Sequence, residues 1–203
     1  MLKIFDNHIP EELRVQLVHD KEYTERPMEY YTFWEFKHFN NPTTKIEEAL
    51  HHIWKDLVDP NDYPDGGIEY WVNKSVGSSK GIWHLDLVEA EQIKEYHPAV
   101  MSVAYYPYID CIGGFLEICD NKGRPSKQEF KDYLRGLDPQ TQVERIKPYT
   151  NRAVFYNADR IHRVAKTYHG VREALASSVW KKKPLTFNNK VSYNINTSVE
   201  SSR

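Results

Sequence analysis

The sequence has little cysteine, no marked excess of either charge and no long uninterrupted apolar run. Its two cysteines, Cys111 and Cys119, are too few for the disulfide framework of a small secreted domain, so we expect two reduced core thiols. A formal charge of −2 with both signs mixed gives no electrostatic basis for nonspecific nucleic-acid binding. No apolar run could span a membrane, and residues 1–6 lack the apolar core of a signal peptide. We therefore expect a cytoplasmic protein that binds neither nucleic acid nor a membrane.

The chain is long enough for one substantial hydrophobic core. With 203 residues, a single domain is the natural expectation. We predict that this domain occupies residues 1–187, with helical support over residues 1–66 and a strand-rich part over residues 67–187. Residues 188–203 are polar and rich in serine and asparagine, which predicts a peripheral tail.

Two helices are predicted in the N-terminal third. Residues 11–20 place Leu13 and Leu17 on one side of a short helix. Residues 44–58 repeat apolar side chains at the helical period, and Thr44 followed by a glutamate three residues later makes a capping box. Proline and glycine residues after position 58 end this second helix.

From residue 68 onward the pattern changes to short apolar-rich segments between turn residues. We predict strands over residues 68–74, 82–87, 99–106, 115–119, 141–147, 152–156, 161–167 and 173–180. Many short strands at such spacing are typical of a sandwich or jelly-roll, so the fold is expected to be mainly β with flanking helices. The polar segment 120–140 interrupts the strands and fits a lid over the site or a surface decoration about equally well.

One predicted strand contains the pattern His84-Leu85-Asp86. Alternate residues of a strand face the same side, so His84 and Asp86 can bind one metal ion. A third ligand must come from another strand, and His162 lies in such a segment. Two histidines and one carboxylate with open coordination positions are the ligand set of non-haem Fe(II) oxygenases. A single His-x-Asp pattern often arises by chance, and a histidine among apolar residues is more often a core residue.

The order of further motifs favours the metal-binding interpretation. After the His-x-Asp pattern come Gly113-Gly114, a proline-led strand, His162 and then Arg172. A buried arginine near a metal could bind a dicarboxylate co-substrate through paired hydrogen bonds. An arginine on a strand is otherwise commonly a solvated edge charge.

This ordered set resembles the 2-oxoglutarate- and Fe(II)-dependent oxygenases, in particular their prolyl-hydroxylase-like branch. The resemblance runs over residues 69–180 and rests on Trp83-His84-Leu85-Asp86, Ala104-Tyr105-Tyr106-Pro107, Gly113-Gly114-Phe115-Leu116-Glu117, residues 148–155, Ile161-His162-Arg163-Val164 and Gly170-Val171-Arg172. It implies a double-stranded β-helix, which is a cupin-like jelly-roll with the metal at one open end. It also implies Fe(II), 2-oxoglutarate and dioxygen, with ascorbate as an accompanying reductant.

The resemblance also implies a role for individual residues of this chain. The implied metal ligands are His84, Asp86 and His162. Arg172 would bind the distal carboxylate of 2-oxoglutarate, with Tyr106 as its hydrogen-bonding partner and Tyr105 as the alternative.

Two positions depart from the pattern of the family. Ala174 stands where many relatives have serine or threonine two residues after the arginine, so the co-substrate carboxylate must find its hydroxyl elsewhere. Asn151 replaces a glycine before the final metal-binding hairpin, and asparagine tolerates the positive φ angle that such a turn requires.

The function implied by the resemblance is hydroxylation of a C–H bond, coupled to decarboxylation of 2-oxoglutarate to succinate and CO₂. The expected substrate is a prolyl or other amino-acid side chain, in a peptide or free. An alternative is a cupin-like metal- or ligand-binding protein without oxygenase activity, which would have no use for Arg172. A third interpretation is a jelly-roll interaction module in which these residues coincide by chance.

Overall fold

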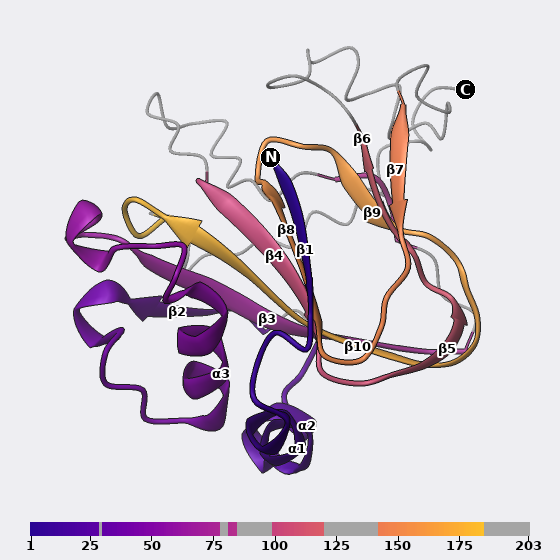
Figure 1. Ribbon diagram of the computed structural model, residues 1–203, viewed down its shortest axis with the longest axis horizontal. Helices are drawn as coiled ribbons and strands as arrows, with labels where there is room; N and C mark the ends of the chain where they lie inside the picture. The colour runs from indigo at the N-terminus through magenta and orange to yellow at the C-terminus, as the bar shows by residue number, and fades with distance from the viewer. Residues whose placement is uncertain (29, 78–80, 85–98, 120–141, 185–203) are drawn as a thin grey trace, which may run out of the picture.

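Two β-sheets and a group of N-terminal helices make up the fold (Figure 1). The computed structural model describes residues 1–28, 30–77, 81–84, 99–119 and 142–184. The helical segments are α1 (Glu11–His19), α2 (Lys21–Thr24), α3 (Lys45–Trp54) and the short 3₁₀ turns η1 (Phe36–His38) and η2 (Pro60–Asp62). The strands are β1 (Leu2–Asp6), β2 (Thr32–Glu35), β3 (Gly67–Val76), β4 (Met101–Tyr106), β5 (Ile109–Gly113), β6 (Leu116–Cys119), β7 (Val143–Ile146), β8 (Arg152–Asn157), β9 (His162–Val164) and β10 (Thr167–Trp180).

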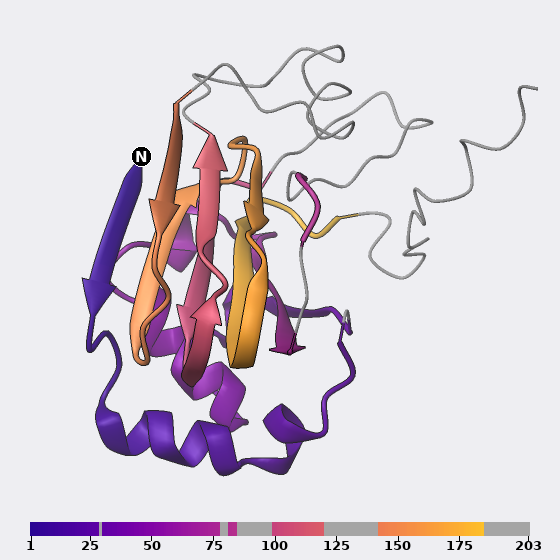
Figure 2. The same cartoon turned by 90° about the vertical axis from the view of Figure 1, so that its right-hand side faces the viewer.

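The strands divide into a large and a small antiparallel sheet. In the described part of the chain, the large sheet has the order β1-β8-β4-β10-β3-β2, with β5 added beside β10, and the small sheet has the order β7-β6-β9. The long strand β10 holds the large sheet together, since it pairs with β3, β4 and β5. Figure 2 shows the strands side by side, with N-terminal helices below them.

Alternate residues of the large sheet face two different cores, because successive side chains of a strand point to opposite faces. In β4, Tyr105 belongs to the core that includes α3, whereas Tyr106 belongs to the core shared with the small sheet. In β8, Phe155 lies in the first core and Tyr156 in the second. Ala174 of β10 also lies in the second core. The large sheet therefore separates a helical core from an inter-sheet core.

This arrangement is the jelly-roll with flanking helices that the strand pattern predicts. Every predicted strand with described residues has an observed counterpart. In the predicted strand 82–87 the structure describes residues 82–84, and of these His84 alone pairs, through a single bridge. Residues 1–66, expected to be helical support, also contribute β1 and β2 to the large sheet. The predicted insertion 120–140, the tail 188–203 and the end of the strand 82–87 lie outside the described residues.

The second helix begins as the capping box predicts but ends earlier than expected. Thr44 Oγ1 accepts a hydrogen bond from the backbone N–H of Glu47 at 3.1 Å, while the Glu47 carboxylate accepts from Thr43. The apolar face of α3 is buried, including Leu50 and Trp54. The regular helix stops at Trp54, whose carbonyl oxygen accepts hydrogen bonds from two residues of the following turn.

The turn before β8 requires a residue that tolerates a left-handed backbone. Asn151 has a φ of 62°, which agrees with its expected role in place of a glycine. Its buried side chain also joins distant segments: Oδ1 accepts from Tyr105 Oη at 3.0 Å and from the Ile9 N–H at 3.2 Å, and Nδ2 donates to the Ile9 carbonyl at 2.9 Å. Asparagine therefore supplies contacts here that glycine could not make.

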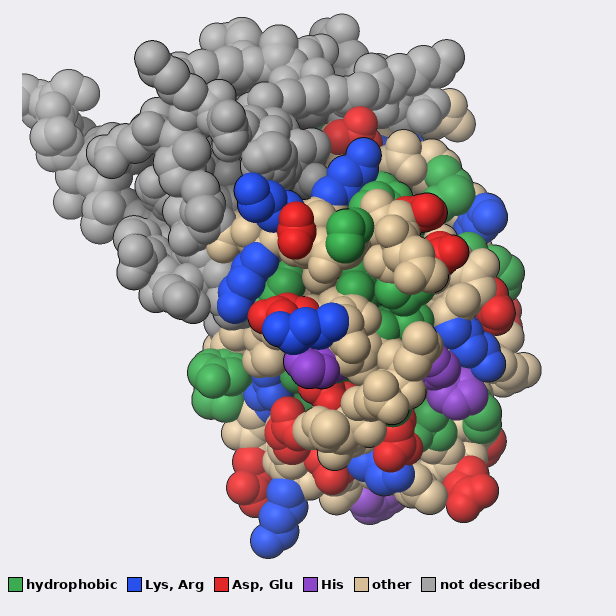
Figure 3. Space-filling view, turned by 90° about the vertical axis from the view of Figure 1, so that its left-hand side faces the viewer, with side chains coloured by type: hydrophobic (Ala, Val, Ile, Leu, Met, Phe, Trp, Pro, Cys, Tyr) green, Lys and Arg blue, Asp and Glu red, His purple; other side chains and the backbone are tan. Residues whose placement is uncertain are grey.

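The face of the molecule that lies on the left of Figure 1 carries side chains of both charges, interspersed (Figure 3). The mixture is what a formal charge of −2 from 27 basic and 29 acidic residues leads one to expect. Neither cysteine forms a disulfide bond: Cys119 is buried on β6, and Cys111 is partly exposed on β5. Among the described residues, no helix combines the length and apolarity needed to cross a bilayer.

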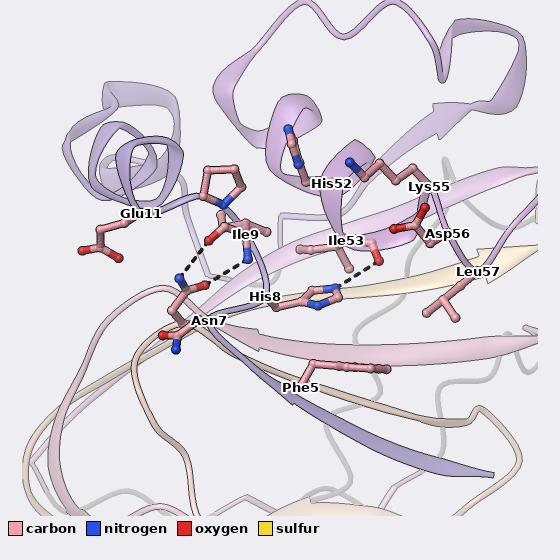
Figure 4. A pocket seen from close by; sticks show the side chains of 12 residues that line it. Phe5, Asn7, His8, Ile9, Glu11, His52, Ile53, Lys55, Asp56 and Leu57 are labelled. Atoms are coloured by element: carbon pink, nitrogen blue, oxygen red, sulfur yellow. Dashed lines mark hydrogen bonds between the residues drawn. The ribbon is translucent and has the colours of Figure 1, made fainter.

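His8, just after β1, connects this strand to helix α3. Its ring stacks on Phe5 at a centroid distance of 5.2 Å and meets the edge of Phe155 at 5.3 Å. Its Nε2 donates a hydrogen bond to the Ile53 carbonyl at 3.3 Å (Figure 4). Burial lowers the pKa of His8 below its ordinary value of 6.5.

We expect this histidine to make the fold less stable in acid. Because the pKa of His8 is lower in the folded state, the unfolded chain binds a proton more readily as the pH falls. The free energy of unfolding should therefore decrease as the pH falls through 6.5 toward the folded pKa. Urea unfolding of the wild type and of His8→Gln at roughly pH 7.5 and 5.5 tests this. The variant should lose less stability between the two conditions; an equal loss in both proteins would contradict the expectation.

Candidate active site

The two histidines of the predicted metal site lie side by side on neighbouring segments. The N–H of His84 donates to the carbonyl of His162 at 2.9 Å, and the N–H of His162 donates back at 3.0 Å. This exchange is an antiparallel bridge, so both side chains leave the backbone on the same face. Their ring centroids are 4.3 Å apart. Segments far apart in the sequence thus bring two imidazoles together.

Backbone carbonyls fix the orientation of both rings. His84 Nδ1 donates to the Ile82 carbonyl at 2.9 Å, and His162 Nδ1 donates to the Arg160 carbonyl at 3.0 Å. A carbonyl oxygen only accepts hydrogen bonds, so in the neutral rings Nδ1 carries the proton and Nε2 carries the lone pair. Metal-binding histidines are commonly held in this way, with the second ring nitrogen donating to a carbonyl.

Tyr156 marks the direction in which His162 points. The buried Tyr156 hydroxyl donates to His162 Nε2 at 3.2 Å, and the two ring centroids are 4.8 Å apart. Since Tyr156 belongs to the inter-sheet core, Nε2 of this histidine faces the space between the sheets. No motif in the sequence distinguishes Tyr156 from the other tyrosines of the chain. Its position on the inner face of β8 follows from strand alternation, but its contact with His162 depends on how the sheets pack.

The third predicted ligand, Asp86, lies outside the described residues and stays a prediction. Within the described part of the chain, no three side chains of the metal-binding types come close enough to hold an ion. Up to His84, the side chains nevertheless alternate between the two faces of the strand as expected. Trp83 packs in a separate cluster with Cys119 and Ile161, on the face opposite to the histidine pair.

Arg172 is a buried cation on β10. Its side chain is about 1% exposed. Its Nε donates to the Gly114 carbonyl at 3.0 Å and its Nη2 to Tyr106 Oη at 3.4 Å. Among the described residues, no carboxylate forms an ion pair with it, and Nη1 has no hydrogen-bond partner. A buried charge is unfavourable unless it is paired, so this guanidinium fits an anionic ligand.

The two candidate tyrosines lie on opposite faces of the large sheet. Tyr106 contacts Arg172, and the guanidinium carbon lies 5.0 Å from the Tyr106 ring centroid. Burial raises the pKa of Tyr106, although the charge of Arg172 lowers it in part, so the hydroxyl keeps its proton near neutral pH. That hydroxyl accepts from Arg172 and still has a proton to donate. Tyr105 instead donates to Asn151 on the helical side, where burial raises its pKa as well.

The residues that face the inter-sheet core fit a metal ion together with a carboxylate ligand. Tyr156 beside the histidine pair and Tyr106 beside Arg172 belong to one buried cluster. Ala174, two residues after Arg172, lies in the same cluster and contributes no hydroxyl. The imidazoles suit a divalent metal, and Arg172 with its unpartnered nitrogen suits a carboxylate.

Gly114 gives Arg172 the space that it occupies. Its φ is +66°, and a Cβ atom at this position would lie 2.9 Å from Arg172 Cδ and 3.1 Å from Thr167 Oγ1. Gly113, just before it, has a φ of +87°. The pair connects β5 to β6, so it is a turn and also brings the backbone close to the buried arginine.

A separate cavity of about 870 Å³ lies on the helical side of the large sheet (Figure 4). It is lined by Phe5 and residues 7–11, by side chains from the end of α3 and the turn after it, and by Asn151. None of the residues predicted from the sequence to form the site lines this cavity. The inter-sheet residues, and not this cavity, therefore carry the candidate chemistry.

Comparison with solved structures shows that the chain shares the fold of the prolyl hydroxylases, which are 2-oxoglutarate- and Fe(II)-dependent oxygenases. A Pseudomonas putida prolyl-4-hydroxylase superposes with a TM-score of 0.58 at 10% identity, over 90% of this chain and 93% of the other. A viral collagen prolyl hydroxylase of Paramecium bursaria Chlorella virus-1, in a 2-oxoglutarate complex, gives 0.53 at 11% identity, over 88% and 94%.

A third similar structure is a Trichoplax adhaerens prolyl hydroxylase in complex with a peptide fragment of the hypoxia-inducible-factor oxygen degradation domain. It superposes with a TM-score of 0.52 at 13% identity, over 89% of this chain and 83% of the other. No protein-family model and no curated protein matches the sequence. At such low identity, the structural likeness establishes the fold, and the activity has to be argued from the site.

Proposed function

We propose that this protein is a 2-oxoglutarate- and Fe(II)-dependent dioxygenase that hydroxylates a C–H bond. One oxygen atom of O₂ would enter the hydroxylated product and the other the succinate formed, with CO₂ released, as 2-oxoglutarate is decarboxylated. The observation that carries the proposal is Arg172, a buried guanidinium with one unpartnered nitrogen among the described residues. A non-oxygenase cupin would have no use for such a cation next to Tyr106 in the inter-sheet core.

The metal end of the proposed site consists of His84 and His162, with Asp86 expected from the same strand as His84. In both imidazoles Nδ1 carries the proton, so Nε2 is the nitrogen that would bind a metal. At His162 the metal would replace the hydrogen bond that Nε2 accepts from Tyr156. Bound Fe(II) would supply the activation of dioxygen that a C–H oxidation requires. The chain itself holds the rings in place through two backbone carbonyls, and it buries the ring of His162.

The co-substrate end consists of Arg172 and Tyr106. A carboxylate beside them would receive a charge-assisted hydrogen bond from Arg172 Nη1 and a second bond from the Tyr106 hydroxyl. In this proposal, the distal carboxylate of 2-oxoglutarate lies here, and Tyr106 is the hydrogen-bonding tyrosine. Tyr105, which donates to Asn151 on the other face of the sheet, would help fasten the turn before β8.

The proposed substrate is a prolyl or other amino-acid side chain, in a peptide or free. The similar structures support this class, since their names are those of prolyl hydroxylases and one of them holds a peptide. Ascorbate as an accompanying reductant belongs to the same proposal.

Turnover in the presence of candidate substrates tests the proposal. The protein would be supplied with Fe(II), 2-oxoglutarate, ascorbate and oxygen, together with prolyl peptides or free amino acids. We expect succinate to form only when Fe(II) is present. It should form faster with the true substrate, and mass spectrometry should then show that this substrate has gained one oxygen atom. Metal binding without 2-oxoglutarate binding or succinate formation would instead support a non-oxygenase cupin.

A methyl group at Gly114 is expected to disturb the co-substrate end. In Gly114→Ala, the new Cβ would press on Arg172 Cδ and Thr167 Oγ1, so the affinity for 2-oxoglutarate should fall by roughly tenfold or more. Gly77→Ala is the matched control, because Gly77 has a similar φ of +70° with nothing within 4 Å of its added Cβ. Both variants should lose stability by about 1–2 kcal/mol from backbone strain. Equal 2-oxoglutarate affinity in the two variants would refute the role of Gly114.

A further inference from the structure

Thr167 places a second unpartnered polar atom beside Arg172. Thr167 begins β10 and is fully buried. Its Oγ1 has no hydrogen-bond partner in the part of the chain that the structure describes, as is also true of Arg172 Nη1. Buried hydroxyls are nearly always hydrogen-bonded, so each such atom in a folded protein calls for an explanation.

The two unpartnered atoms belong to side chains that flank one glycine. A Cβ at Gly114 would lie 3.1 Å from Thr167 Oγ1 and 2.9 Å from Arg172 Cδ. Both backbone polar groups of Gly114 form hydrogen bonds. The N–H donates to the Lys166 carbonyl at 3.0 Å, and the carbonyl accepts from Arg172 Nε at 3.0 Å. Thr167 and Arg172 are therefore held in fixed positions around Gly114.

The chemistry of these groups points to an acceptor that all of them share. Arg172 Nη1 can only donate, the Tyr106 hydroxyl already accepts from Arg172, and Thr167 has a hydroxyl proton to donate. Thr167 and Arg172 flank Gly114, and Tyr106 contacts Arg172, so these three donors together suit a carboxylate, whose two oxygens offer about four lone-pair sites. Ala174, on the same face as Arg172, provides no hydroxyl to this group.

We propose that the Thr167 hydroxyl is a binding residue for the distal carboxylate of 2-oxoglutarate, where it completes a three-donor site with Arg172 and Tyr106. This inference rests on the proposed function and adds to it the residue that selects a dicarboxylate over a monocarboxylate 2-oxoacid. Valine has nearly the same shape as threonine, so Thr167→Val removes the hydroxyl and little else.

Comparing two ligands, one with the distal carboxylate and one without it, tests the contact between this carboxylate and the Thr167 hydroxyl. 2-Oxopentanoate keeps the 2-oxoacid end and chain length of 2-oxoglutarate but ends in a methyl group. Both would be titrated anaerobically into Mn(II)-loaded wild type and Thr167→Val. We expect Thr167→Val to weaken 2-oxoglutarate binding by about tenfold to a hundredfold, the usual effect of losing a hydrogen bond to a charged group, and to leave 2-oxopentanoate binding unchanged. An equal change for the two ligands, or no change for either, would overturn the proposal.

Two further variants control this comparison. Thr167→Ser keeps the hydroxyl and should retain the preference for 2-oxoglutarate. Ser178→Ala removes another buried hydroxyl of β10, one that pairs with Ser102 at 2.9 Å, and should leave the affinity for both ligands unchanged. A loss of preference in Thr167→Ser equal to that in Thr167→Val would show that shape, and not the hydroxyl, matters.

The stability of the ligand-free protein gives a separate measurement. Because Thr167 Oγ1 has no partner in the described structure, Thr167→Val should leave the melting temperature unchanged or raise it. A lower melting temperature would mean that the hydroxyl has a structural role, and would contradict the proposal. Failure of the wild type to bind 2-oxoglutarate would refute the proposed function itself. Equal affinity for 2-oxoglutarate in the wild type and Thr167→Val would refute only this inference.

Discussion

Arg172→Met should weaken the binding of 2-oxoglutarate by at least about a hundredfold and leave the binding of Mn(II) unchanged. Truncating one partner of a buried, hydrogen-bonded charge pair typically costs about 2–5 kcal/mol, and 1.4 kcal/mol corresponds to a factor of ten in affinity. Methionine fills a similar volume without charge, so the effect should come from the lost guanidinium. Anaerobic calorimetry on the metal-loaded proteins measures both affinities.

Another buried arginine provides the control for this variant. The Arg26 side chain is about 5% exposed and pairs with Glu22 at 3.0 Å on the helical side of the sheet. Arg26→Met should lower stability while the affinity for 2-oxoglutarate stays that of wild type. If Arg172→Met also bound 2-oxoglutarate as wild type does, another cation would have to hold the co-substrate.

The second large effect is expected at the metal ligands. Asp86→Ala and His162→Ala should each weaken metal binding by more than about a hundredfold, since losing even an outer-shell partner of a metal ligand commonly weakens binding 10–100-fold. Fe(II)-dependent formation of succinate should fall below detection. Metal titration monitored by calorimetry, with succinate measured in parallel, tests both variants.

An exposed histidine outside the proposed ligand set serves as the control here. His169→Ala, on β10, should bind metal and turn over as wild type does. Circular dichroism before titration shows whether each variant remains folded. Retained metal binding and turnover in Asp86→Ala would remove Asp86 from the ligand set.

Hydrophobic periodicity predicts most of the fold, because the strands that build the two cores have buried faces. The exceptions are strands whose place depends on backbone pairing. Most of β1 is exposed, and it is held by its register with β8, where Leu2 lies opposite Tyr156. Strand β5 alternates between exposed and half-buried residues and pairs with the first part of β10. No local pattern in the sequence reports such edge pairings.

The candidate site also has features that the sequence predicts and contacts that it does not. In keeping with strand alternation, Trp83, next to His84, packs in a separate cluster with Cys119 and Ile161. The order of motifs suggests His162 as the partner of His84, and the two residues form a bridge. The contact between Tyr156 and His162 depends on packing between strands, which the sequence does not display. No sequence motif distinguishes Thr167 either, although the absence of a hydroxyl at Ala174 indicates that the co-substrate carboxylate needs one from another residue.

The central claim is that metal and 2-oxoglutarate bind together in the inter-sheet core. Thermal unfolding under anaerobic conditions, with Mn(II) in place of Fe(II), tests it most directly, because a ligand that binds only the folded state raises the melting temperature. We predict a rise with Mn(II), a further rise with 2-oxoglutarate that requires Mn(II), and a smaller one with succinate. A rise with Mn(II) and none with 2-oxoglutarate would contradict the claim and make Arg172 a structural residue.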